Sequence, residues 1–128
     1  MILDSDLVIL IHKFILDREP GVDGMNEGAL QSALGRIENR RMYAGLDDVF
    51  EIAGMYAEAI ARGHAFADAN KRTALVSALT YLAVEGFLIR RTQALEEFMV
   101  DVAQGKLNYL DLANIFASLA VPAPNEIS

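Results

Sequence analysis

The sequence predicts a single all-α domain of about six helices. Apolar residues recur at three- and four-residue spacing through most of the chain, which is the period of helices with one buried face. The length of 128 residues and the hydrophobic fraction of 53% are consistent with one domain that buries its own core. No segment pairs convincingly with another as strands, and no internal repeat is present. We place the domain at residues 1–120 and expect residues 121–128 to form a flexible C-terminal tail.

The first predicted helix runs from Asp4 to about Arg18, with Asp4 or Ser5 as its N-cap. Its end is predicted at residues 19–21, where a proline and a glycine follow each other. The apolar face is expected to consist of Leu7, Leu10, Ile11, Phe14 and Ile15. His12 is offset from this face, and without acidic or hydroxyl neighbours it is interpreted as structural.

The second and third helices follow a glycine-rich loop at residues 21–28. Asn26 can cap a short helix over residues 29–37, which the polar residues 38–41 are expected to end. Asp47 is the predicted cap of the third helix, which is apolar on nearly all sides and is therefore expected to be central. This helix should end at residue 62, with Gly63 just beyond it.

Three more helices complete the predicted fold. Residues 73–85 have a strong helical pattern that Gly86 closes. Thr92 can cap a fifth helix, ended by Gly105, and Asn108 can cap the last one.

Composition limits the classes of function. The net charge of −7 argues against direct binding of nucleic acid, which normally requires a basic face. No apolar run reaches the roughly 20 residues that cross a bilayer, and the N-terminus carries acids where a signal peptide carries basic residues. These features predict a cytoplasmic protein with no membrane partner. The absence of cysteine excludes disulfides, a thiolate nucleophile and cysteine-ligated zinc.

A polar cluster at residues 63–75 separates the third and fourth helices. Its chemistry-bearing side chains are His64, Asp68, Asn70, Lys71 and Arg72. Lys71 and Arg72 fall in the first turn of a helix, where a cation is unfavourable by about 0.3–1 kcal/mol because free N–H groups make that end partly positive. Two cations there are explained by a bound anion such as a phosphate. The alternative is that both side chains point into solvent or pair with surface acids.

Neighbouring residues support the phosphate hypothesis. His64 precedes the helix start, and a histidine can accept a proton near neutral pH. Asp68 could hold a divalent cation that bridges phosphates. Phe66 is interpreted as an apolar anchor of the loop. Asn70 is interpreted as the N-cap, and it could also hold the loop in its active shape, since the two roles are compatible. One histidine cannot complete a zinc site without cysteines, and no Gly-x-Ser-x-Gly motif is present.

The polar cluster also resembles a family signature. Residues 64–72 resemble the Fic/Doc motif His-x-Phe-x-Asp/Glu-Gly/Ala-Asn-Gly/Lys-Arg. The flanking residues 62–63 and 73–75, and the earlier stretch 21–34, are similar to the Doc branch of that family. The resemblance spans most of the chain and implies a helical bundle of the Fic/Doc fold.

The form of the motif implies which group is transferred. Fic enzymes that transfer AMP have Gly-Asn-Gly-Arg and a second arginine downstream, whereas this chain has Ala69-Asn70-Lys71-Arg72 followed by Leu75 and Val76 near that second position. This is the Doc form. It implies a toxin of a toxin–antitoxin module, a protein kinase that transfers the ATP γ-phosphate to a threonine of elongation factor Tu and halts translation. The alternatives are Fic-type AMP transfer to a protein hydroxyl, and an inactive homologue that only binds its partner.

The resemblance also implies roles for single residues. His64 would be the general base for the target hydroxyl, and Asp68 would bind Mg²⁺ or orient the phosphates of ATP. Asn70, Lys71 and Arg72 would hold the phosphates, with the two cations stabilising charge during transfer. Arg62 matches a family arginine near the site.

Restraint of the toxin is expected to come from another protein. Many Fic enzymes carry an inhibitory helix with the motif Ser/Thr-x-x-x-Glu-Gly/Asn. Here Tyr81 stands at the first position before Glu85, and Leu34 stands there before Glu38, so neither segment fits. The resemblance therefore implies a separate antitoxin of the Phd type, whose C-terminal segment would fold onto this protein.

Overall fold

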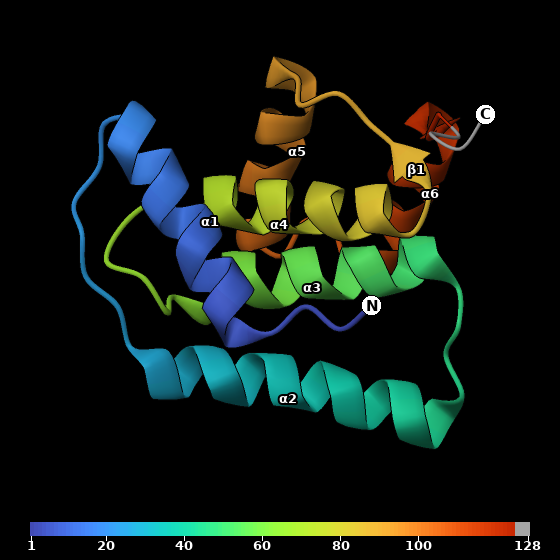
Figure 1. The fold of residues 1–128 in the computed structure, drawn as a ribbon, viewed down its shortest axis with the longest axis horizontal. Coiled ribbons are helices and arrows are strands. Elements are labelled where there is room, and N and C mark those ends of the chain that lie inside the picture. The colour runs from blue at the N-terminus through green and yellow to red at the C-terminus, as the bar shows by residue number, and fades with distance from the viewer. Residues whose placement is uncertain (125–128) are drawn as a thin grey trace.

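The computed structural model describes residues 1–124, and residues 125–128 lie outside the described part. Within residues 1–124 the protein is a mostly helical single domain of six helices, which confirms the predicted fold class (Figure 1). The helices are α1 (Ser5–Arg18), α2 (Glu27–Ala44), α3 (Val49–Gly63), α4 (Asn70–Val84), α5 (Gln93–Ala103) and α6 (Tyr109–Leu119).

Helix α3 is the centre of the domain, as its apolar circumference predicts. It packs against α2, α4, α5 and α6, and its side chains are buried along more than half of its length. Its alanines have small side chains, which allow these neighbours to approach closely. Helix α4 runs beside α3, and α1 packs across α4 near the start of that helix (Figure 1). The polar cluster therefore lies where three helices meet.

Most helix starts are capped as predicted, because a cap is a local interaction. The side chain of Asp4 accepts a hydrogen bond from Leu7 N at 2.9 Å, and that of Thr92 accepts one from Leu95 N at 3.2 Å. Asn26 caps α2, and Asn108 caps α6 in a capping box. The predicted cap of α3 was wrong by one residue: it is Asp48, which accepts hydrogen bonds from two backbone N–H groups.

Two further expectations about α1 and α2 were wrong. Helix α2 does not end at residues 38–41 but continues to Ala44, because its polar side chains find partners: Arg41 pairs with Glu38 at 3.2 Å. On α1, Leu10 and Phe14 are 62% and 52% exposed, and His12 is buried instead. The helix carries apolar residues on two faces, and only its packing decides which face is inside.

A short strand pair was not predicted. Strand β1 (Phe87–Leu88) pairs antiparallel with β2 (Val121–Pro122), and Ala123 N donates to Gly86 O at 2.8 Å. Two-residue strands are too short to show alternation in a sequence. The first residues of the segment expected as a tail are thus held against the domain, and its last four lie outside the described residues.

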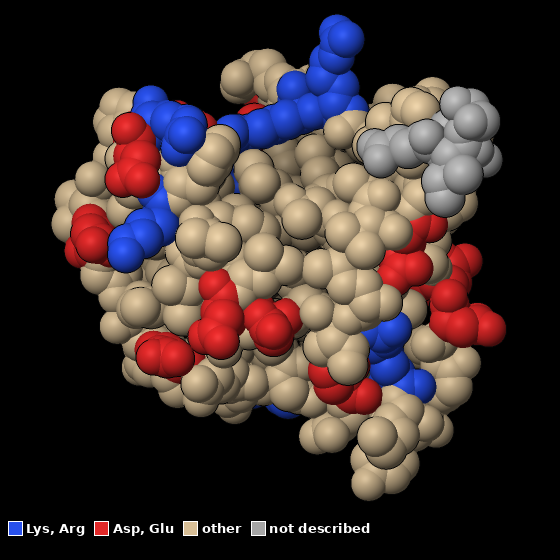
Figure 2. Space-filling model, in the orientation of Figure 1, with Lys and Arg blue, Asp and Glu red and all other residues tan. Residues whose placement is uncertain are grey.

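Two properties of the described residues concern possible partners. No helix in residues 1–124 is long and apolar enough to cross a membrane. Figure 2 shows one face of the molecule, on which basic side chains lie in small groups near acidic ones, with wide areas of other residues between them.

Candidate active site

The loop between α3 and α4 begins and ends with residues in the left-handed backbone conformation. His64 has φ 49° and Ala69 has φ 65°, although neither is glycine. Such a conformation costs about 1–2 kcal/mol for a residue with a side chain. The predicted position of Gly63 beyond the helix was wrong: Gly63 is the last residue of α3, and His64 takes the position after it. Strain of this kind is typical of functional loops.

The glycine-rich loop before α2 holds this connection from one side. Asn26 N donates to Ala65 O at 2.6 Å and Ala67 N donates to Gly24 O at 2.8 Å, so that Met25 and Phe66 form an antiparallel bridge. Gly24 has φ 143°, and a Cβ there would lie 3.2 Å from the Cβ of Ala67. The glycine-rich segment therefore supports the polar cluster directly, which its composition alone did not indicate.

A buried aromatic pair holds the loop from beneath. Phe66 is 3% exposed and stacks on the His12 imidazole with 3.9 Å between ring centroids, which confirms Phe66 as the anchor of the loop. His12 Nε2 lies 2.9 Å from the backbone oxygen of Asp68, and because a carbonyl only accepts, Nε2 donates. His12 is thus structural, as expected, and it orients the backbone of a proposed site residue.

The side chain of Asn70 links the start of α4 to the middle of the loop. It is the first residue of α4, whereas the N-cap position belongs to Ala69, which makes no side-chain cap. The amide oxygen of Asn70 accepts from Phe66 N at 3.1 Å, and its nitrogen donates to Phe66 O at 2.9 Å. The N-cap interpretation of Asn70 was therefore wrong, and the geometry supports its other predicted role, that of holding the loop.

We expect the substitution Asn70→Ala to destabilise the protein by about 1–3 kcal/mol, because it leaves both backbone groups of Phe66 without their partner. Urea unfolding measures the loss, and hydrogen exchange of the Phe66 amide shows whether the loop opens. The exposed Asn39→Ala on α2 is the control. An unchanged exchange rate at Phe66 would show that Asn70 does not hold the loop.

Asp68 presents an ionised carboxylate at the start of α4. One oxygen accepts from Ala69 N at 2.7 Å and the other accepts from Val22 N at 3.1 Å. The hydrogen bond from Ala69, reinforced by the one from Val22 and by the charges of Arg72 and Lys71, lowers the pKa of Asp68 below its usual range. Its side chain remains 46% exposed, so it is open to a ligand.

Arg72 is held by a network that sequence reasoning missed. It donates to Pro20 O at 2.9 Å and lies 3.4 Å from Glu19, which follows α1. Glu19 in turn accepts two hydrogen bonds from Arg91, at 2.9 and 3.2 Å, and Arg91 also pairs with Glu96. The network joins the end of α1 to α4 and α5 over long sequence distances, and an acidic residue after a helix gives no signal of it.

The same network predicts a pH dependence of stability. The hydrogen bond from Arg91, with the charges of Arg91 and Arg72, lowers the pKa of Glu19 against an opposing effect of burial. Because the folded-state pKa is the lower one, the stabilisation is complete above the unfolded pKa of about 4.3 and is lost as pH falls through the folded value. We expect Glu19→Gln to lower the free energy of unfolding by about 1 kcal/mol at pH 7.

Urea unfolding of wild type and Glu19→Gln from neutral to acidic pH measures this difference, which should shrink below about pH 4.3. The control Asp17→Asn removes one negative charge from the exposed side of α1. Its free energy of unfolding should be close to that of wild type at every pH. A constant deficit of Glu19→Gln down to acidic pH would contradict an electrostatic origin.

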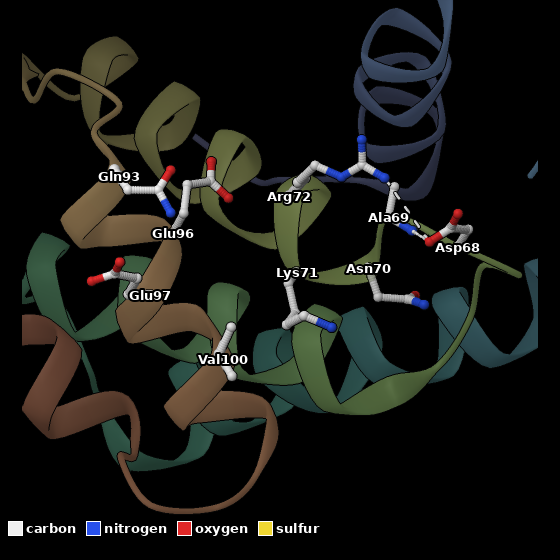
Figure 3. A pocket seen from close by; sticks show the side chains of 9 residues that line it. All are labelled: Asp68, Ala69, Asn70, Lys71, Arg72, Gln93, Glu96, Glu97 and Val100. Atoms are coloured by element: carbon white, nitrogen blue, oxygen red, sulfur yellow. Dashed lines mark hydrogen bonds and ion pairs between the residues drawn. The ribbon is translucent and has the colours of Figure 1, made fainter. Parts of the chain in front are cut away.

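A pocket of about 300 Å³ opens at the start of α4, facing α5 (Figure 3). The structure brings four of the predicted site residues together in its lining: Asp68, Asn70, Lys71 and Arg72. Ala69 lies between them, and α5 contributes Gln93, Glu96, Glu97 and Val100. The α5 residues were missed because they follow the motif by more than 20 positions. Only the packing of α5 against α4 places them there.

Lys71 is the lining cation most available to a ligand. It is exposed, and among residues 1–124 no carboxylate lies within 4 Å of it, whereas Arg72 is already paired with Glu19 and Asp68. Its position in the first turn of α4 places its positive charge beside free backbone N–H groups. The arrangement is chemically suited to a phosphate group.

The remaining two predicted residues lie outside this lining. His64 is exposed at the opposite end of the loop. Arg62 donates to the carbonyl oxygens of Val102 at 2.9 Å and Leu107 at 2.7 Å, and lies 3.4 Å from Glu58. Arg62 therefore ties α3 to the connection between α5 and α6, and the structure does not bring it to the pocket of Lys71.

Fold and site together define a class: a small helical protein with a pocket at the start of one helix, an exposed lysine in its lining and an exposed histidine in the preceding loop. A model of the Fic/DOC family matches residues 2–82, and the chain belongs to the Fic/Doc family, as the motif predicts. It is also 35% identical over 118 residues to "Protein kinase doc" of Escherichia phage P1, an alignment that covers 91% of this chain and 94% of that protein.

Proposed function

We propose that this protein is a Doc-type toxin: a protein kinase that transfers the γ-phosphate of ATP to a threonine of elongation factor Tu and so inhibits translation. The observation that carries the proposal is Lys71, an exposed cation without a carboxylate partner in the described residues, in the first turn of α4. Support comes from the similarity to a protein named a kinase in phage P1. Nucleotides are the substrates of the Fic/Doc family, and the choice of ATP belongs to the proposal.

The described residues suggest how such a transfer would be performed. Lys71 and Arg72 stabilise the charge that spreads over the transferred phosphoryl group, together with the N–H groups at the start of α4. His64 accepts the proton of the attacking hydroxyl from the outer end of the loop. Asn70 holds the loop in its conformation through its two hydrogen bonds to Phe66. The position of His64 relative to the phosphate-binding residues is thereby kept fixed.

A magnesium ion fits the residues that are present. Within residues 1–124 no three acidic or histidine side chains gather as metal ligands, so these residues alone do not form a complete metal site. Mg²⁺ commonly binds through one or two carboxylates together with the phosphates of a nucleotide, and the ionised, partly exposed Asp68 would be that carboxylate. When bound, Mg²⁺ would neutralise phosphate charge in a pocket whose lining holds three acids and two bases.

Restraint by a Phd-type antitoxin and a cytoplasmic location belong to the same proposal. The support is indirect: the inhibitory motif begins with serine or threonine, and the residues at that position here are Tyr81 and Leu34. Uncontrolled activity would arrest growth, so the proposal predicts that the gene is tolerated only together with that of a partner.

The decisive experiment uses ATP labelled separately at the α- and γ-phosphates, incubated with purified protein and elongation factor Tu. We expect the γ label alone to appear on a threonine of elongation factor Tu, identified by mass spectrometry. Transfer of the α label would instead establish AMP transfer, and no transfer of either label would leave the binding-only alternative. Lys71→Ala is the internal control, because it should reduce transfer of the γ label without changing the fold.

A further inference from the structure

A second hollow, which we name the α2–α3 groove, lies between two helices that run side by side in Figure 1. Its volume is about 400 Å³, compared with about 300 Å³ for the pocket of Lys71 at the start of α4. Its floor is apolar, and its rim carries Arg36 and Arg40 from α2 and Glu58 and Arg62 from α3. No residue of the pocket of Lys71 contributes to it.

The net charge of the groove lining is opposite in sign to that of the whole chain. Its lining holds three arginines and one glutamate, a formal charge of +2, whereas the chain carries −7. Glu58 is already engaged, because it accepts from Tyr109 N at 2.6 Å and lies 3.4 Å from Arg62. The groove therefore presents positive charge to solvent.

Two of the arginines are held in place but lack an acidic partner. The Arg40 guanidinium lies 4.8 Å from the centre of the Tyr109 ring and donates to its hydroxyl at 2.8 Å. Arg36 donates to Ser32 Oγ at 3.1 Å. Within residues 1–124 no carboxylate lies within 4 Å of either guanidinium. Each guanidinium has five N–H donors, so most of them are left for a ligand.

The position of the groove indicates which ligand it serves. Gly63 belongs to its lining, and the next residue is His64. A polypeptide bound in the groove would therefore be delivered beside the proposed base. Arg36 and Arg40 are four residues apart on one helix, which separates them by about 6 Å along its axis.

We propose that the α2–α3 groove binds an acidic segment of the protein substrate, with carboxylates about 6 Å apart that pair with Arg36 and Arg40. Acidic side chains four apart on a helix or two apart on a strand have this spacing. Apolar side chains between them would contact Ile37 and Met55 on the floor. Only the identity of the occupant rests on the proposed function, in which His64 is the base that activates the hydroxyl of the protein substrate.

A binding experiment tests the groove without requiring catalysis. The probe is a short helical peptide with two glutamates four residues apart, titrated into the ¹⁵N-labelled protein. We expect shifts of amide signals along the facing sides of α2 and α3, and no such shifts with the matched glutamine peptide. Shifts confined to the pocket of Lys71, or equal shifts with both peptides, would overturn the proposal.

A kinetic experiment then tests the occupant. The double variant Arg36→Ala/Arg40→Ala should raise KM for elongation factor Tu roughly 3- to 30-fold, the effect of two partly exposed ion pairs, and should leave kcat and KM for ATP unchanged. The control Lys13→Ala/Arg18→Ala removes equal charge from the exposed side of α1, outside the groove, and should leave all three constants unchanged.

The outcomes separate this inference from the proposed function. If wild type transfers no phosphate to elongation factor Tu but the glutamate peptide binds along α2 and α3, the groove stands and the named function fails. If transfer occurs and both double variants have the same KM as wild type, the function stands and the groove proposal is wrong.

Discussion

Replacing His64 by alanine is expected to reduce phosphate transfer by at least about 100-fold, since the attacking hydroxyl loses its proton acceptor. Because His64 does not line the pocket of Lys71, the affinity for ATP should remain that of wild type. The initial rate of transfer from γ-labelled ATP measures the first quantity, and titration with a fluorescent ATP analogue measures the second.

A second variant excludes misfolding as the cause of the loss. His64 has φ 49°, a backbone conformation in which glycine is relaxed, so His64→Gly should unfold at the same or a higher temperature than wild type while being equally inactive. In cells without an antitoxin, wild type should arrest growth and both variants should not. Equal toxicity of wild type and His64→Ala would defeat the catalytic proposal and favour a protein that acts by binding.

A large effect on stability is also expected from Gly54→Ala, at the contact between α3 and α6. A Cβ at Gly54 would overlap the carbonyl oxygen of Tyr109 and would lie 3.2 Å from its carbonyl carbon. Since these are backbone atoms at the start of α6, they cannot rotate away as a side chain could. We expect the substitution to lower the free energy of unfolding by about 1–3 kcal/mol, measured by urea denaturation.

Gly35→Ala on α2 is the matched control, because no heavy atom lies within 4 Å of the added methyl group. This variant should be more stable than wild type by up to about 1 kcal/mol, since alanine favours a helix over glycine. A Gly54→Ala protein as stable as wild type would show that α6 can move away from α3 without cost. Crystals of that variant would then reveal the displacement of Tyr109.

Local features of this fold could be predicted because their causes are local. The capping side chains accept a hydrogen bond from a backbone N–H three residues further on, as in Asp4, Thr92 and Asn108. Such caps can therefore be predicted from the sequence. Phe66 was predictable as an anchor because it is the one large apolar side chain in the loop between α3 and α4. The motif from His64 to Arg72 indicated the family by residue type and spacing, and a family match over residues 2–82 confirms it.

The sequence by itself determined the helical class, the family and the cluster that holds Asp68, Asn70, Lys71 and Arg72. Only the tertiary structure decided which face of α1 is buried, that α5 completes the pocket, and that Arg62 bonds to carbonyl groups away from it. The physical reason is one of range. Caps and periodicity depend on neighbours within a few residues, whereas Glu19 reaches Arg91 across 72 positions, and no local pattern encodes such a contact.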